Sequence, residues 1–193
     1  MITRKNNLIV RSLFVATFLF LVASSATFAQ ALNSNTATVT LNATLSESLT
    51  VAATPSNVAF TLVSGSTANG SAPVAMTTKW VLSNARTSVT LVGYFSSAAA
   101  ALTDGATTPT NIPTSEVLGQ VTTGTPTALT AFTQSAPLGT AGAGLTLFTQ
   151  AITGTNRAAT RNDNLNLQIN LTSQPQLPAG TYTGTLNLQA QAL

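Results

Sequence analysis

The sequence predicts an all-β protein, an antiparallel β-sandwich of about eight or nine short strands with at most one short helical turn. Apolar and polar residues alternate along much of the chain, most clearly at Leu165, Leu167, Ile169 and Leu171, which are separated by Asn and Gln. This period of two is typical of strands with one buried face. Turn-forming residues separate the alternating segments, and no segment shows the 3.6-residue period of a helix.

Residues 1–29 have the three parts of a secretory signal peptide. Basic residues at positions 4, 5 and 11 precede an apolar core at 13–23 and the small residues SSATFA. We expect cleavage after Ala29 or Ala31. The apolar core is shorter than the roughly 20 residues of a membrane-spanning helix. The sequence therefore predicts export to the periplasm and then to the cell surface or the medium, with no transmembrane segment in the mature chain.

The mature chain, residues 30–193, is expected to be neutral and to form a single sandwich domain. The net charge of the whole sequence is +3, but three basic residues lie in the signal peptide, which leaves four basic and four acidic residues. A neutral chain lacks the basic stripe that nucleic acid requires, so nucleic acid is not an expected partner. Because the chain has no cysteine, its stability must come from core packing and backbone pairing.

The first alternating stretch of the mature chain, residues 37–53, is too long for one strand. At about 3.3 Å per residue it would exceed about 50 Å, whereas most strands reach about 17–20 Å. Glu47 places a charge on its apolar parity. We therefore expect two strands that meet at residues 46–48.

The remaining chain divides into short alternating segments. Strands are expected over 58–62, 74–82, 89–95, 117–121, 129–132, 145–152, 165–171 and 182–193. We interpret 96–102 as one helical turn, 103–144 as a loop-rich end of the sandwich and 154–164 as a polar connection. Trp80 has the inward parity of its strand, which indicates a core tryptophan, and Lys79 has the outward parity.

The sequence predicts no catalytic, metal or cofactor site. The absence of His and Cys removes the usual ligands of zinc, copper and haem and the usual base for a nucleophilic Ser or Thr. We interpret the four acidic residues as solvated surface groups rather than as the paired carboxylates of a glycosidase. These acids are Glu47, Asp104, Glu116 and Asp163. We therefore expect a protein that is not an enzyme and needs no cofactor.

The last seventeen residues, LPAGTYTGTLNLQAQAL, combine a turn with a cleanly alternating strand. Gly180 and Tyr182 stand at the strand entrance in the layout of a tyrosine corner, in which the phenol hydroxyl bonds to the backbone upstream. This corner makes the expected sandwich immunoglobulin-like. In that fold one more strand follows, but here the sequence ends at Leu193. We expect the last strand to have an open edge.

The segment PAGTYTGTL at 178–186 resembles the C-terminal strand of spore-coat-U-type proteins and of the major pilins of archaic chaperone–usher fimbriae. The alternation at 37–45 and the Thr-, Ala- and Gly-rich composition are similar to those pilins as well. The resemblance implies a structural subunit of a surface fibre or pilus-like assembly. It also implies other fibre subunits, a periplasmic chaperone and an outer-membrane usher as partners.

In this family, subunits are joined by donor-strand β-augmentation, in which an extended segment of one subunit completes the sheet of another. The candidate donor residues here are Val39, Leu41, Ala43 and Leu45. Two arrangements are consistent with the sequence. If residues 37–45 complete their own sandwich, the protein is a monomeric binding module for glycans or surface adhesion, using the loops between 96 and 144. If they enter a neighbour, the contact is head-to-tail and gives fibres.

Overall fold

The computed structural model describes residues 32–133 and 144–193, and within these ranges almost all regular structure is β-strand. One helical element is present there, the 3₁₀ turn Thr114–Glu116 (η1). The strands are β1 Ser48–Thr54, β2 Thr67–Asn69, β3 Val74–Val81, β4 Ser88–Tyr94, β5 Leu102–Thr103, β6 Asn111–Ile112, β7 Val117–Val121, β8 Thr130–Ala131, β9 Leu145–Ala151, β10 Ala158–Asn170 and β11 Asn187–Ala192. The expected signal peptide and part of the expected loop-rich end lie outside the described residues.

The chain divides into two units, Met1–Ala43 and Thr44–Leu193. The described part of the first unit, residues 32–43, contains no strand and is exposed throughout. The second unit contains every strand of the structure. The alternating stretch 37–53 is therefore divided near the expected break, because β1 begins at Ser48, immediately after Glu47.

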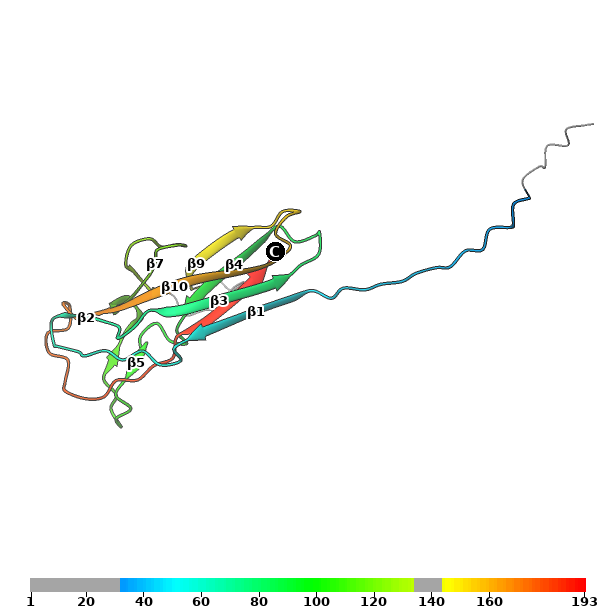
Figure 1. Cartoon of the computed structure of the whole chain (residues 1–193). Coiled ribbons are helices and arrows are strands. Elements are labelled where there is room, and N and C mark those ends of the chain that lie inside the picture. The colour runs from blue at the N-terminus through cyan, green and yellow to red at the C-terminus, as the bar shows by residue number, and fades with distance from the viewer. Residues whose placement is uncertain (1–31, 134–143) are drawn as a thin grey trace, which may run out of the picture. The chain divides into compact units, whose positions relative to one another are not determined.

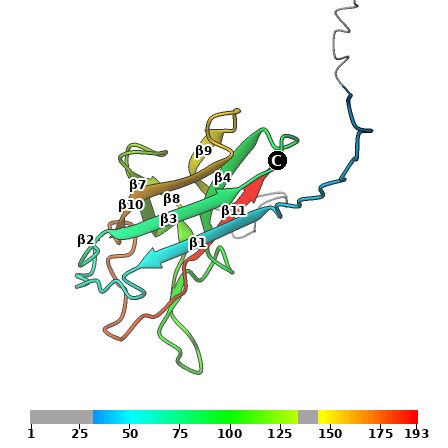
Figure 2. The same ribbon diagram turned by 45° about the vertical axis from the view of Figure 1, so that its right-hand side comes forward.

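The strands of the second unit form an antiparallel sandwich, as Figures 1 and 2 show. The larger sheet has the order β1-β3-β10-β7-β8, with β2 also paired to β10, and the smaller sheet has the order β11-β4-β9. β5 and β6 form a separate hairpin. Every strand pair is antiparallel. The predicted all-β sandwich is confirmed.

The main core lies between the two sheets and follows from the alternation of β3. Met76 and Trp80 face inward and are buried, whereas Lys79 is exposed on the outer face. Val89 and Leu91 of β4 contribute from the opposite sheet and are fully buried. Trp80 is 4% exposed, and its indole nitrogen donates a hydrogen bond to the carbonyl of Asn156 at 2.8 Å. The interpretation of Trp80 as a core residue is confirmed.

The expected polar connection at 154–164 is wrong in its second half, because β10 already begins at Ala158 and continues to Asn170. Residues 158–165 pair with β3 over its whole length. The sequence did not indicate this strand because Arg161 and Asp163 lie within it, and charged residues are unusual on an inward face. In the structure the two side chains pair with each other at 2.7 Å, which makes the burial of Asp163 tolerable.

Two other expected elements are absent from the described ranges. Residues 58–62 form no strand, although Val58, Phe60 and Leu62 are half-buried at every second position as expected. Residues 96–102 form no helical turn. Their backbone groups bond across the chain instead, because Ala101 N–H donates to Ile112 O at 2.8 Å and Thr114 N–H donates to Ala98 O at 2.9 Å.

The terminal strand is shorter than predicted and begins at Asn187 rather than at Tyr182. The preceding residues run beside the β5–β6 hairpin, where Thr183 and Thr103 exchange two backbone hydrogen bonds of 2.9 Å. Gly184 permits this approach, because a Cβ at that position would overlap the carbonyl of Ala101. Residues 182–186 therefore lead into β11 without being part of its sheet.

Candidate functional site: an open seam at the sandwich edge

The most unusual feature of the sandwich is the edge where β1 and β11 lie side by side. Among the described strands, β1 ends the larger sheet and has β3 as its one partner, and β11 ends the smaller sheet and has β4 as its one partner. The two strands are close to each other but belong to different sheets, as both ribbon views show. Neither sheet is continued across this edge within the described residues. An edge strand is a ready template for pairing with another chain.

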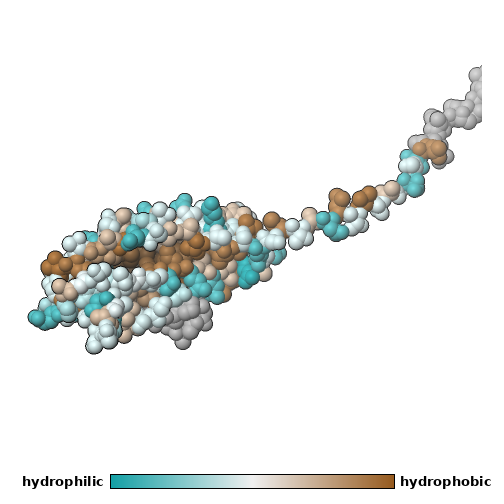
Figure 3. Space-filling view, turned by 90° about the horizontal axis from the view of Figure 1, so that it is seen from below, coloured by the Kyte–Doolittle hydropathy of each residue, from teal (hydrophilic) through white to brown (hydrophobic). Residues whose placement is uncertain are grey.

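The inward side chains of the two edge strands, together with Leu186 just before β11, define an apolar strip, which we call the open seam. They are packed against the main core but only half-buried, in contrast to the fully buried residues of β3 and β4. The open seam consists of Leu49, Val51, Leu186, Leu188, Ala190 and Ala192. Figure 3 looks at this edge and shows an apolar band running along the sandwich between hydrophilic margins.

The candidate donor residues are all exposed. Val39 is 82% exposed, Leu41 is 88% exposed and Leu45 is 85% exposed, and Ala43 is exposed as well. Apolar side chains of this size are normally buried, and three of them share one parity here. The described structure thus contains both a half-buried apolar strip and a separate exposed segment with alternating apolar residues.

One end of the open seam carries an ion pair that sequence reasoning did not foresee, which we call the Glu47–Arg86 clip. The carboxylate of Glu47 accepts hydrogen bonds from the backbone N–H of Ser83 at 2.7 Å, from Arg86 Nε at 3.3 Å and from Arg86 Nη2 at 3.1 Å. Arg86 Nη1 also donates to the carbonyl of Ala192 at 3.3 Å. The clip therefore connects the residue before β1, the β3–β4 loop and the last residue of β11.

The clip lowers the pKa of Glu47 from 4.5 to about 2, chiefly through the hydrogen bonds from Arg86 and then through that from the Ser83 backbone. A carboxylate with a lowered pKa in the folded state adds stability that is complete above its unfolded pKa and is lost as the pH falls through the folded value. The contribution of Glu47 should therefore be constant above pH 4.5 and decline between pH 4.5 and about 2.

We expect the difference in unfolding free energy between the unsubstituted chain and Glu47→Gln to be constant between about pH 7 and 5 and to fall steadily below that. Urea denaturation at a series of pH values measures this difference. A difference that stays flat down to pH 2 would show that the Glu47 carboxylate has an ordinary pKa in the folded chain.

At the other end of the seam, Tyr182 has the geometry of a tyrosine corner. Its hydroxyl donates to the carbonyl oxygen of Pro178 at 2.9 Å. Partial burial, and secondly the charge of Asp104, raise the pKa of Tyr182. Gly180 lies beside the ring, but a Cβ there would be 3.7 Å from Tyr182 Cε2, an ordinary contact, so the corner does not require glycine at this position.

Tyr182→Phe should lower the unfolding free energy by about 1 kcal/mol, since it removes one net hydrogen bond and leaves the Pro178 carbonyl without that donor. Chemical denaturation of the two chains under identical conditions measures the change. If their stabilities are equal, the hydroxyl contributes nothing to the corner.

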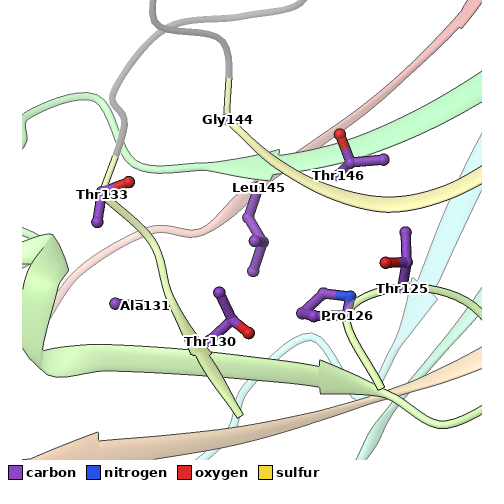
Figure 4. Close-up of a pocket in the computed structure, with 8 residues that line it drawn as sticks. All are labelled: Thr125, Pro126, Thr130, Ala131, Thr133, Gly144, Leu145 and Thr146. Atoms are coloured by element: carbon purple, nitrogen blue, oxygen red, sulfur yellow. The ribbon is translucent and has the colours of Figure 1, made fainter. Parts of the chain in front are cut away.

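Away from the seam, the loops contain a pocket of about 520 Å³ that lies between the β7–β8 connection and the start of β9 (Figure 4). Four of its eight described lining residues are threonines, and none of these eight residues is charged or aromatic. The lining residues are Thr125, Pro126, Thr130, Ala131, Thr133, Gly144, Leu145 and Thr146. The pocket falls within the loops that the sequence proposed for a binding module.

The acidic residues have separate roles in the structure. Asp104 accepts from the backbone N–H groups of Ala106 and Thr110, both at 3.1 Å, and so shapes a loop. Glu116 accepts from the Ser173 hydroxyl. The interpretation of Asp163 as a solvated surface acid is wrong, because it is 5% exposed and paired with Arg161. In the described part of the chain, no three acidic residues come together as they would around a metal ion.

No family model, curated protein or solved structure matches this chain. Among the residues that the structure describes, there is no helix with the length and apolarity needed to cross a membrane. The function is therefore inferred from the sheets, their edges and the contacts at those edges.

Proposed function

We propose that this protein is an exported, non-enzymatic structural subunit of a surface fibre or pilus-like assembly. In this proposal the N-terminal segment 37–45 of one copy pairs along β11 in the open seam of the next. The observation that carries the proposal is that two neighbouring edge strands leave their inward apolar residues half-buried. An added strand would bury these residues and pair with the backbone at the outer edge of the sheet at the same time.

The donor segment has the chemistry that the seam requires. Residues 37–45 alternate apolar and polar side chains, so a strand formed from them has one apolar face. Nine residues in extended conformation span about 30 Å, which is sufficient to follow the six residues of β11 and the last of the residues leading into it. Neither the segment nor the seam carries a charge along its length, apart from the clip at one end.

The sequence features support the same proposal. The signal peptide expected at 1–29 would deliver the chain to the compartment where such fibres assemble. The immunoglobulin-like arrangement indicated by the Tyr182 corner is that of the pilins that the sequence resembles. On this basis we propose self-association or other fibre subunits as partners, together with a periplasmic chaperone and an outer-membrane usher.

Two complementary variants of the chain from residue 30 test the proposal. Leu41→Asn with Leu45→Asn removes the apolar face of the donor and leaves the seam intact. Ala190→Gln obstructs the seam and leaves the donor intact. We expect each variant to be monomeric alone and the mixture to form one-to-one heterodimers, because only one of the two possible contacts remains functional. Size-exclusion chromatography with light scattering measures the masses, and electron microscopy shows whether the unsubstituted chain forms fibres.

Thr40→Asn with Thr44→Asn is the matched control, because it changes the same number of residues on the opposite face of the donor segment. This control should assemble as the unsubstituted chain does. The proposal fails if the unsubstituted chain is a stable monomer at high concentration. It also fails if the two complementary variants assemble separately, since association would then involve another surface.

The Thr-lined pocket favours a second function, that of a monomeric binding module for glycans or surface adhesion. Its hydroxyl groups are suited to hydrogen bonding with a neutral polar ligand. Saturable binding on a glycan array that is lost with Thr130→Val and Thr146→Val, from a chain that does not self-associate, would favour this function over a fibre subunit.

A further inference from the structure

We propose that Ser46 and Glu47, held by the Glu47–Arg86 clip, are positioning residues that direct segment 37–45 away from the seam of its own chain. The occupant of each seam is then the segment of a second copy. This inference rests on the proposed function and adds to it the residues that keep segment 37–45 out of the seam of its own chain. It depends on the direction of the strands, on the chemistry of the two hinge residues and on the bonds of the clip.

The direction of the strands makes self-completion demanding. β1 and β11 run in opposite directions, and the start of β1 lies at the same end of the seam as the C-terminal end of β11 (Figure 1). Arg86 bonds to both strands at this end of the seam, to Glu47 just before β1 and to Ala192 in β11. Only Ser46 and Glu47 separate Leu45 from β1. To enter its own seam, the segment would have to reverse direction over these two residues.

The hinge residues are poorly suited to such a reversal. Two-residue hairpin loops use type I′ or II′ turns, which need a positive φ and therefore favour Gly, Asn or Asp. Ser46 and Glu47 are not among these residue types, and the first glycine of the chain is Gly65. No non-glycine residue in the described ranges has a positive φ. Residues 44–47 thus enter β1 without a turn of this kind.

The clip adds a second obstacle. In a type I′ hairpin turn Glu47 would be a loop residue with a positive φ, which it does not have in the structure. In the structure the carboxylate accepts three hydrogen bonds from Ser83 and Arg86, and its side chain remains 36% exposed. A turn at this point would change the backbone conformation of Glu47 and move its carboxylate away from the Ser83 and Arg86 donors.

An outward-directed donor has a consequence for the assembly. Each chain then offers a donor at one end and accepts one along its seam, so that the contact is heterologous and does not close on itself. Copies add head to tail. Because a single residue separates Leu45 from Glu47, successive sandwiches are expected to be connected by a short and stiff hinge rather than by a long linker.

The test replaces the hinge with a hairpin turn. Ser46→Asn with Glu47→Gly introduces an Asn-Gly pair, which favours a type I′ turn, and removes the clip. In the chain from residue 30 we expect this variant to lose all species larger than a monomer, because each donor now fills its own seam. Ser34→Asn with Asn35→Gly is the matched control, since it introduces the same pair upstream of the donor, and it should assemble normally.

A cross-linking readout separates self-completion from a variant that merely folds poorly. The chain has no cysteine, so that Ala43→Cys and Ala190→Cys introduce two unique thiols. A short bis-maleimide should join different chains in the unsubstituted background and should join the two thiols of one chain in the hinge variant. Denaturing gels distinguish the two products by mass.

The outcomes distinguish the inference from the proposed function. If the hinge variant assembles as the unsubstituted chain does, or cross-links between chains, the clip does not select the partner and the inference is overturned, while the fibre function stands. If neither the unsubstituted chain nor the matched control associates, the proposed function itself fails. A monomeric, internally cross-linked hinge variant beside an assembling control supports both.

Discussion

Phe132→Ala is expected to lower the unfolding free energy by about 3–5 kcal/mol, the largest effect of any single substitution considered for this protein. Phe132 is fully buried, and its ring meets that of Phe95 edge to face with centroids 5.4 Å apart. The ring occupies space left by two glycines, one from each sheet. A Cβ at Gly93 would be 3.0 Å from the ring, and a Cβ at Gly119 would be 2.9 Å from it.

Because of this arrangement, we expect the loss of unfolding free energy for Phe132→Ala to lie at the upper end of the range of about 3–5 kcal/mol. A cavity is costly when its walls cannot move inward, and glycines have no side chain with which to fill it. Leu129→Ala is the matched control, because Leu129 is three residues away and 39% exposed, so that its truncation should cost less than about 1 kcal/mol. Urea denaturation of both variants measures the effect. Similar losses in the two would contradict the role of Phe132 in joining the sheets.

Asp163→Asn is expected to destabilise the fold by about 3 kcal/mol, because it leaves the guanidinium of Arg161 without its counter-charge. The Asp163 side chain is 2% exposed, and its carboxylate accepts from Arg161 Nε at 2.7 Å and from Thr123 Oγ1 at 2.6 Å. Arg161 in turn lies over the ring of Phe148 at 4.5 Å and donates to Gln150 of β9 at 3.2 Å.

These contacts connect β10 in one sheet with β9 in the other, which is a polar tie between the sheets of a chain that has no disulfide. Because the Arg161 side chain is 22% exposed and keeps some access to water, we place the loss at the lower end of the range for broken buried pairs. Lys79→Gln removes one charge from the exposed outer face and should change stability by less than about 0.5 kcal/mol. Equal effects of the two substitutions in thermal or urea unfolding would show that the buried Arg161–Asp163 pair stabilises the fold no more than an exposed charge does.

The sequence predicted the all-β sandwich and most of its strands because strand signals are local. β3, β4, β7 and β9 appear within one or two residues of the expected ranges. Trp80 is buried as its parity indicated. The same reasoning failed where the decisive partner is distant in sequence. Arg161 and Asp163 look like loop residues until Thr123 and Gln150 are placed beside them.

The candidate site shows the same division. Alternation at 37–45 and in the terminal strand was visible in the sequence, and so was the anomalous charge at Glu47. The sequence did not show that Glu47 pairs with Arg86, thirty-nine positions away. The only signal that pointed to it was the position of a charge on an apolar parity, which indicates a break but does not name the partner.

The sequence alone therefore determined the fold class and the break before β1, because side-chain parity and turn residues act over a few neighbouring positions. Tertiary structure decided which strands became edges, that β1 and β11 adjoin, and that their inward residues remain half-buried. Those properties depend on the order of strands in two sheets, which arises from contacts between distant segments and is not encoded in any one of them.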